Sequence, residues 1–322
     1  MRQLPDTVRQ EMNPLSYHLS KWFGWNDPPY QTRLREAVSK AFTPEVVARM
    51  HPRIQNIVDE LIGNVQGLGQ MDVICDMANP LPVTVIAELL GVPQEYREKF
   101  KQGADDIVAF FGAGRAQPDT AERAQRAILT INEFLKDIVD QRRRHPENDL
   151  ITNLLAGEQQ GHLLTEEELI GPYVFFLVAG HETTTDLIGN GMLALLQNPD
   201  QMVRLRDKPS LIGSAVEEFL RYDSPVQRIW RLANRDCEID GKRGHSLILT
   251  NLISGEETTT TLLSELGDIF VWEQRSPVLR HRSLFRRCCG RLPFLRLVIK
   301  ALEWKPTMSV RSLKALPVVF QV

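Results

Sequence analysis

Residues 171–198 read GPYVFFLVAGHETTTDLIGNGMLALLQN, and the organisation of the whole chain follows from this stretch. Apolar residues fill nearly every position on both sides of its centre, and a helix that is apolar on all faces is a buried helix. Pro172 suits a first helical turn, and the pair Asn198-Pro199 suits a helix end. We therefore predict one buried helix from Pro172 to Leu196, about 37 Å long and so as wide as a domain.

The centre of this helix, residues 179–186, reads AGHETTTD and is polar where its flanks are apolar. Charged and hydroxyl side chains inside a buried helix must each find a partner. Gly180 adds a cost of about 1 kcal/mol in helix propensity relative to alanine. A local rule that is broken at the centre of a core element is typical of a functional site. The alternative is a polar cluster with internal hydrogen bonds and no function.

Length and composition limit the class of protein. The 322 residues can form one large domain or two ordinary ones, and the hydrophobic content of 43% with a charged content of 25% is typical of a soluble globular protein. The net charge of −3 argues against a general nucleic-acid binder. The N-terminal segment MRQLPDTVRQEM lacks the apolar core of a signal peptide, and no apolar run is long enough to cross a membrane. We expect a cytoplasmic protein with neither a membrane nor a nucleic-acid partner.

Periodicity and boundary residues predict further helices around the central one. Their expected ranges are residues 28–42, 43–62, 80–90, 94–111, 120–144, 150–156 and 210–225. Thr165 and Glu168 form a capping-box pattern ahead of the central helix. Short strands are expected in residues 226–242, with a turn at Asp240-Gly241, and in residues 302–304 and 316–320. The predicted fold class is therefore mainly α with small β-sheets (α+β).

Residues 246–292 fit none of these patterns. They contain a threonine run, no sustained periodicity and many Arg and His residues near position 285. Such a basic patch could contact a phosphate or a nucleic acid. The acidic chain around it and the lack of interleaved aromatic residues argue against that interpretation.

Five motifs in the same order resemble the cytochrome P-450 family of haem-thiolate monooxygenases, in its soluble bacterial type. They are DPPYQTRLR (27–35), LPVTVIAELLGVP (81–93), AGHETTT (179–185), EEFLR followed by SPVQ (217–227), and LEWKP with LKALPVVF (302–320). The resemblance covers residues 15–243 and 292–322, and residues 246–291 form an aberrant segment. It implies a single domain over residues 1–322, with an incomplete P-450-like helical fold around a long central helix.

The resemblance assigns catalytic roles to the polar centre of the predicted helix. Ala179 and Gly180 match the kink where dioxygen binds over the haem iron in this family. Glu182 and Thr183 match its acid–alcohol pair, which relays protons. The residues themselves agree, because a carboxylate beside a hydroxyl in a buried helix forms a sensible proton path.

Other roles follow from the resemblance in the same way. Arg35 and Arg231 match positions that bind the haem propionates, a task that suits the bidentate, charge-assisted hydrogen bonds of arginine. Gln31 occupies a cofactor-binding position where many bacterial members carry histidine. Glu218 and Arg221 match the buried E-x-x-R pair that stabilises the core of the family.

Two departures from the family are visible. The segment before residue 27 is short, so the first helix, the first strands and part of a substrate loop of the family have no counterpart, and the chain looks N-terminally truncated.

The cysteine loop Phe-Gly-x-Gly-x-His-x-Cys-x-Gly, whose thiolate binds iron, is not recognisable. Cys288-Cys289-Gly290 retains only Cys-x-Gly, which makes Cys288 the candidate iron ligand and Cys289 the next. Cys75 and Cys237 suit ordinary buried positions. We hypothesise that residues 246–291 are translated from a shifted reading frame, which the nucleotide sequence tests.

The resemblance implies a haem-dependent monooxygenase with haem b as its iron cofactor. Such an enzyme inserts one oxygen atom from O2 into a small hydrophobic organic substrate and takes electrons from a ferredoxin or flavodoxin partner. The departures keep an alternative open, which is an inactive, haem-free degenerate member of the family. A more distant alternative is a helical interaction protein that reuses the scaffold. Whether this particular chain is an active enzyme is left open by the sequence.

Overall fold

The structure is a computed structural model. It describes residues 13–22, 26–41, 44–112, 118–158, 165–232, 237–239, 242–244, 248–252, 284–285, 287–288, 290–292, 294–298, 301–307 and 309–322. The described chain is mainly helical with small β-sheets, which confirms the predicted fold class. The hypothesis of a shifted reading frame concerns a segment that lies largely outside the described residues.

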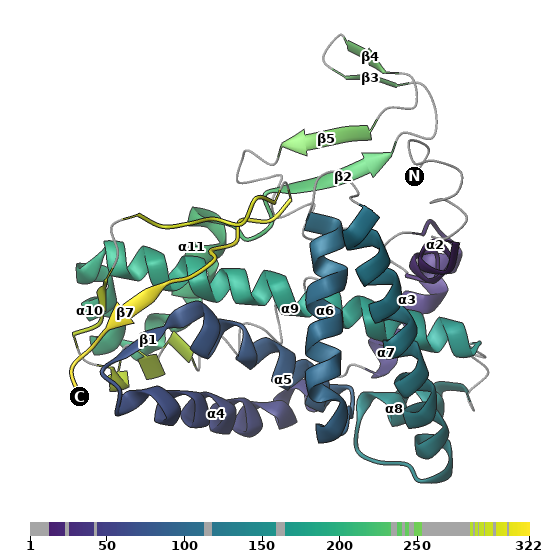
Figure 1. The fold of residues 1–322 in the computed structure, drawn as a ribbon, viewed down its shortest axis with the longest axis horizontal. Coiled ribbons are helices and arrows are strands. Elements are labelled where there is room, and N and C mark those ends of the chain that lie inside the picture. The colour runs from purple at the N-terminus through teal and green to yellow at the C-terminus, as the bar shows by residue number, and fades with distance from the viewer. Residues whose placement is uncertain are drawn as a thin grey trace.

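The central helix α9 spans Glu166–Gln197 and runs through the middle of the molecule (Figure 1). It begins with the expected capping box, in which Glu168 N donates to Thr165 Oγ1 at 3.2 Å and Thr165 N donates to Glu168 Oε2 at 3.0 Å. The predicted start at Pro172 was wrong, because these caps satisfy backbone donors nearly two turns before the proline. At the other end, Asn198 N donates to Ala194 O and Leu195 O, so the predicted end is confirmed to within one residue.

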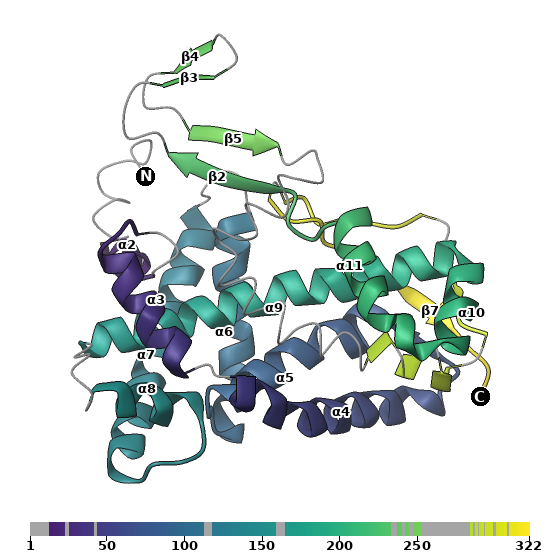
Figure 2. The ribbon, with the colours of Figure 1, turned by 180° about the vertical axis from the view of Figure 1, so that it is seen from behind.

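The other helices surround α9 on both sides (Figures 1 and 2). They are α2 (Asn13–Leu19), α3 (Tyr30–Ala41), α4 (Pro44–Gln66), α5 (Pro80–Leu89), α6 (Arg97–Gly112), α7 (Pro118–Arg144), α8 (Leu150–Glu158), α10 (Pro199–Asp207) and α11 (Ile212–Tyr222). Short π and 3₁₀ turns occur at Val73–Ala78 (η2), Gln94–Tyr96 (η3) and Pro209–Leu211 (η4). Helices α2, α5, α6, α7, α10 and α11 and the turn η2 contact α9 directly. In the part of the chain that is described, no helix is both long and apolar enough to cross a membrane.

The strands form three small antiparallel sheets. Strands β1 (Gln70–Asp72), β7 (Pro317–Val319) and β6 (Arg296–Leu297) lie in the order β1-β7-β6, while β2 (Arg228–Leu232) pairs with β5 (Ile248–Leu252) and β3 (Cys237–Ile239) pairs with β4 (Lys242–Gly244). The expected Asp240-Gly241 turn lies outside the described residues. The expected strand at 302–304 was wrong, since Trp304 makes only an isolated bridge to Leu313 and its ring lies 3.7 Å beneath the Arg311 guanidinium.

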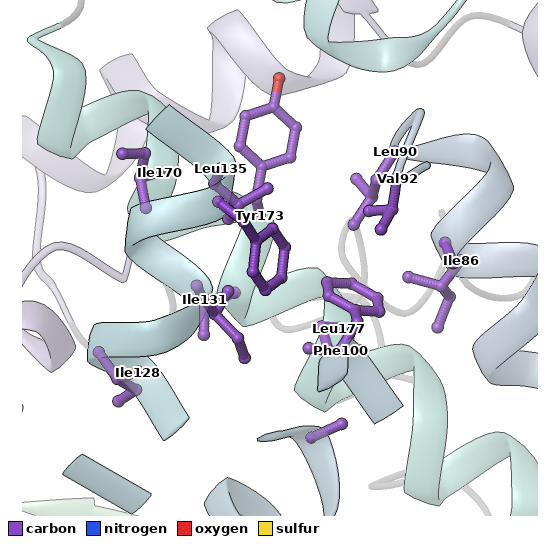
Figure 3. Packing of buried hydrophobic residues seen from close by; sticks show 14 of the residues in the cluster. Ile86, Leu90, Val92, Phe100, Ile128, Ile131, Leu135, Ile170, Tyr173 and Leu177 are labelled. Carbon is purple, nitrogen blue, oxygen red and sulfur yellow. The ribbon is translucent and has the colours of Figure 1, made fainter. Parts of the chain in front are cut away.

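Two hydrophobic clusters pack against opposite halves of α9. The first contains Tyr173 and Leu177 of α9 together with Phe100 of α6 and Ile131 of α7 (Figure 3). The second contains α9 residues from Leu187 to Leu195, with side chains from α4, η2, α11 and the C-terminal segment. Burial of apolar side chains at both ends therefore fixes α9, and the polar residues 179–186 lie between the two clusters.

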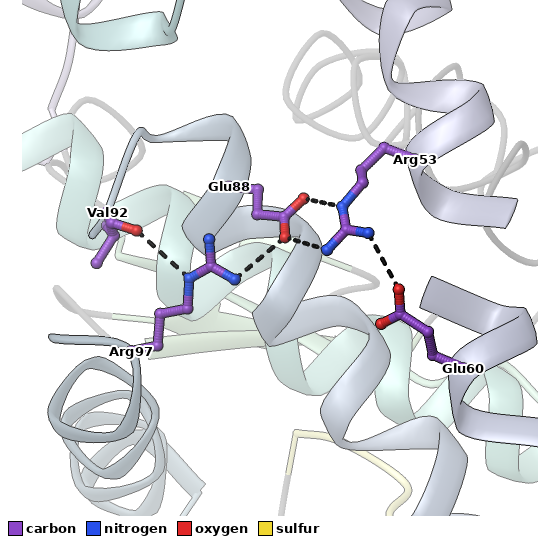
Figure 4. Close-up of polar contacts among 5 residues, drawn as sticks. All are labelled: Arg53, Glu60, Glu88, Val92 and Arg97. Atoms are coloured by element: carbon purple, nitrogen blue, oxygen red, sulfur yellow. Dashed lines mark hydrogen bonds and ion pairs between the residues drawn. The ribbon is translucent and has the colours of Figure 1, made fainter. Parts of the chain in front are cut away.

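A polar network holds α4, α5 and α6 together at the side of the first cluster (Figure 4). The Glu88 carboxylate accepts hydrogen bonds from Arg53 at 2.7 and 2.8 Å and from Arg97 at 3.1 Å. Burial alone would raise the pKa of Glu88, but the hydrogen bonds and charges of Arg53 and Arg97 outweigh it and lower that pKa. This carboxylate thus remains ionised and links three helices.

Candidate active site

Helix α9 presents one accessible face at its centre. Between residues 168 and 193 every side chain is buried except Phe175, Phe176, Val178, Ala179, Glu182 and Thr183, which are partly exposed. Spacings of three, four and seven residues place these positions on one side of a helix. The accessible face is apolar at its N-terminal end and polar at its C-terminal end, where Glu182 and Thr183 lie.

Thr183 and Ala179 are hydrogen-bonded to each other within this face. Thr183 Oγ1 donates to Ala179 O at 2.6 Å, a hydrogen bond to the carbonyl one turn earlier that is known to bend helices. Gly180, between them, is buried and has no Cβ. The expected kink residues are thus gathered in one turn, with a hydroxyl facing the accessible side.

Glu182 is the carboxylate of this face. Its side chain is only 13% exposed, and its Oε1 lies 3.4 Å from Lys305 Nζ. Burial raises the pKa of Glu182, the positive charge and hydrogen bond of Lys305 oppose that rise, and the negative charge of Asp105 adds to it. A carboxyl group with a raised pKa can hold and release a proton nearer to neutral pH.

His181 points away from the accessible face and is structural. Its Nε2 lies 2.7 Å from Asn79 Oδ1, which only accepts, so Nε2 carries the proton and donates it. Its Nδ1 lies 3.7 Å from Asp105 Oδ1. Burial lowers the pKa of His181 to about 4, with smaller contributions from Lys305 and Lys101, so the ring is neutral at physiological pH.

Three residues near this site, Lys305, Ser312 and Asp105, were not found by sequence reasoning. Asp186 Oδ2 accepts a hydrogen bond from Ser312 Oγ at 2.6 Å, and Lys305 comes from the same C-terminal segment as Ser312. Asp105 comes from α6. Asp186 was visible as an unexplained charge in a buried helix, but no sequence pattern indicated that residues more than 120 positions apart meet there.

The structure places the expected propionate-binding residues as follows. Gln31 and Arg35 lie in α3, half-buried, and share one face of it. Arg231 lies in β2, and its side chain is outside the described part of the structure. Arg33, between the first two, binds Glu168 and so links α3 to the N-terminus of α9.

The expected pair Glu218 and Arg221 forms, but it is not buried. Arg221 Nε and Nη2 donate to Glu218 Oε2 and Oε1 at 2.8 and 2.6 Å, while the two side chains are 55% and 56% exposed. The expectation of a buried pair is corrected here, because α11 buries Val216 and Phe219 and turns Glu218 and Arg221 to another face. A solvent-exposed pair contributes little to stability.

The expected iron ligand Cys288 lies among apolar side chains. Cys288 is buried in the second hydrophobic cluster, one turn after Phe285, whose ring contacts Phe219 at 4.8 Å between centroids. Phe285 also packs on Gly191, where an added Cβ would lie 2.7 Å from its ring. Gly191 is about 16 Å along α9 from Gly180, so this cluster does not face the kink. Cys289 lies outside the described residues.

These observations test whether haem fits the chain. The small residues Ala179 and Gly180, the accessible face and the Thr183 hydroxyl on that face would fit the side of a haem at which dioxygen binds. Of the cysteine side chains that the structure describes, Cys288 is buried in the second hydrophobic cluster, and Cys75, which was expected to be buried, is exposed in η2. The residues that fit a haem therefore lie on α9, and none of the described residues is identified as its axial ligand.

Comparison with known proteins identifies the family of this chain. Residues 25–247 match the family described as Cytochrome P450. Cytochrome P450 CYP107DY1 of Priestia megaterium is 35% identical over 313 residues, which is 91% of this chain and 75% of the relative. The biotin biosynthesis cytochrome P450 of Bacillus subtilis is 34% identical over 325 residues, covering 95% of this chain and 82% of the relative.

A solved structure is similar over almost the entire chain. The structure of P450BioI in complex with hexadec-9Z-enoic acid ligated acyl carrier protein superposes with a TM-score of 0.86 at 31% sequence identity. The match covers 96% of this chain and 84% of that protein.

Proposed function

Because the chain belongs to the cytochrome P450 family, we propose that it is a haem-dependent monooxygenase acting on a small hydrophobic organic substrate. In this reaction one oxygen atom from dioxygen is inserted into the substrate. Haem is the cofactor of the family, and when bound it supplies the iron that binds and activates dioxygen. The observation that carries the proposal is the accessible face of α9, with Ala179, Gly180, Glu182 and Thr183 at its polar end.

The apolar end of the same face supports the choice of substrate. Phe175, Phe176 and Val178 are the partly exposed apolar residues of α9 next to the kink. Apolar side chains that stay accessible inside a core are typical of a binding site for an apolar ligand. We propose that they contact the substrate and exclude water from the reacting atoms. Electrons would come from a ferredoxin or flavodoxin partner, which this chain must recruit.

Glu182 and Thr183 would move protons at this site. Glu182 is 13% exposed and so retains limited contact with solvent, from which its carboxyl group can be reprotonated. Thr183 Oγ1 donates to Ala179 O and can also accept a hydrogen bond, so it would pass a proton from Glu182 to the accessible face of α9. Arg35 and Arg231 would bind the two propionates of the haem, with Gln31 beside the first.

Reduced-carbon-monoxide difference spectroscopy tests the proposed function. A thiolate-ligated haem gives a characteristic red-shifted Soret band, and we expect that band from the purified protein reconstituted with haem. A protein that takes up haem without the band would lack the thiolate ligand. No haem uptake at all would contradict the proposed function.

Replacing Thr183 by alanine should uncouple the reaction. Without the hydroxyl, proton delivery slows, so reductant is consumed while hydrogen peroxide is released, and product per reductant should fall by roughly tenfold or more. The measurement is the ratio of product and peroxide to reductant consumed. Thr183→Ser is the matched control, since it keeps the hydroxyl and should keep most of the coupling. Equal coupling in the alanine variant would mean that Thr183 only packs.

A further inference from the structure

The C-terminal segment is bonded to the catalytic turn of α9 by a closed ring of contacts. Lys305 Nζ lies 3.4 Å from Glu182 Oε1, and Ser312 Oγ donates to Asp186 Oδ2 at 2.6 Å. Within the segment, Lys305 N donates to Ser312 O at 2.8 Å. Glu182 and Asp186 are four residues apart and lie on one face of α9, so three contacts close the ring.

From this ring we propose that Lys305 is a positioning residue that holds the Glu182 carboxyl group, and that the Ser312–Asp186 hydrogen bond anchors Lys305. The inference rests on the proposed role of Glu182 in moving protons. It adds that a lysine more than 120 positions away in the sequence sets where that carboxyl group points and how readily it gives up its proton.

The charges around Glu182 support a special role for Lys305. Among the described residues, Lys305 is the cation that pairs with Glu182, and its side chain is 41% exposed. The other ionisable groups that face this region are Asp105 and Lys101 from α6, and His181 and Asp186 from α9 itself. Burial and the negative charge of Asp105 both raise the pKa of Glu182, while Lys305 lowers it. Removing Lys305 would leave the first two effects unopposed.

The hydrogen bond between Ser312 and Asp186, which anchors Lys305, is buried. Ser312 and Asp186 are 1% and 2% exposed, so water does not compete for their hydrogen bond. Burial, with a smaller contribution from the charge of Glu182, raises the pKa of Asp186 to about 8, so its carboxyl group is mostly neutral at pH 7. A neutral Asp186 keeps its bond to Ser312 without drawing Lys305 away from Glu182. At higher pH, Asp186 would ionise and compete for the lysine.

The test is a direct titration of the Glu182 carboxyl group by infrared difference spectroscopy, with the band assigned by its loss in Glu182→Gln. In Lys305→Met, Glu182 should bind its proton on the order of tenfold more tightly, because the opposing positive charge is gone. Lys305→Arg should restore the titration. Ser312→Ala should shift it in the same direction by a smaller factor, since Lys305 loses its anchor but keeps its charge.

Lys314→Met is the matched control. It removes an equal charge from the same segment, but Lys314 pairs with the exposed Glu303 at 3.0 Å and not with Glu182. Its Glu182 titration should equal that of the parent. An unchanged titration in Lys305→Met would overturn the inference. A shifted titration together with normal coupling in Glu182→Gln would keep the positioning role and refute the proton role instead.

Discussion

An enzyme carrying Glu182→Gln should form product on the order of 10²-fold more slowly than the parent, as expected when a positioned acid or base is removed. Glutamine has the same shape and can still accept a hydrogen bond from Lys305, whose Nζ lies 3.4 Å from Glu182 Oε1. The glutamine side chain cannot bind or release a proton near neutral pH. The fold should therefore be kept while proton delivery is lost, and the measurement is the rate of product formation at saturating reductant.

Two controls make this result specific. Glu303→Gln removes a carboxylate from an exposed pair with Lys314 and should leave product formation unchanged. The haem content and the unfolding midpoint of Glu182→Gln should match those of the parent, which excludes a loss of structure. A Glu182→Gln enzyme that works within about twofold of the parent would show that protons reach the site by another path.

Replacing Asp149 by alanine should lower the free energy of unfolding by about 3–5 kcal/mol, the range seen when one partner of a buried ion pair is removed. Arg142 and Asp149 are 7% and 6% exposed, and Arg142 Nε donates to Asp149 Oδ2 at 2.5 Å. Asp149 Oδ1 also accepts from Thr152 N at 2.9 Å near the start of α8. The change removes the buried carboxylate partner of Arg142, which keeps contacts with the exposed Glu147 at 3.0 Å and with Gly91 O at 3.3 Å, and it also removes a helix cap. Urea unfolding followed by circular dichroism measures the effect.

Glu218→Ala provides the comparison within the same protein. Its partner Arg221 is 56% exposed, so water replaces the lost hydrogen bonds and the change should cost about 0.5 kcal/mol. A larger loss for Glu218→Ala than for Asp149→Ala would contradict the burial seen in the structure. The family motif thus points to one Glu–Arg pair, whereas the exposed fractions identify a different ion pair as the buried one.

Patterns local in sequence predicted much of the fold. The capping box at Thr165 and Glu168, the helix stop at Asn198 and the bracket of α5 by Asn79-Pro80 all come from residues within a few positions of each other. Helix periodicity works for the same reason, because side chains three and four apart share a face. Pro172 gave a wrong start for α9, because a proline that suits a first turn is also tolerated inside a longer, well-packed helix.

Contacts between distant segments could not be predicted in this way. Burial of Arg142 with Asp149, exposure of Glu218 and the position of Cys288 depend on which helix face meets the core. The Cys-x-Gly pattern around Cys288 carried no information about where its helix packs. Local sequence sets the type of an element, but its neighbours set the environment of each side chain.

By itself, the sequence determined that this protein has a long buried helix with a polar centre, and it identified Ala179, Gly180, Glu182 and Thr183 as the residues of interest. The helix and its polar centre follow from composition and spacing within one segment, whereas the choice of these four residues within it follows from the resemblance to the cytochrome P-450 family. Only the tertiary structure decided that the polar centre lies between two hydrophobic clusters and that Lys305 and Ser312 reach it from the C-terminal segment. The physical reason is that pairing of buried charges is a property of the packed chain, because partners more than 120 residues apart leave no local pattern.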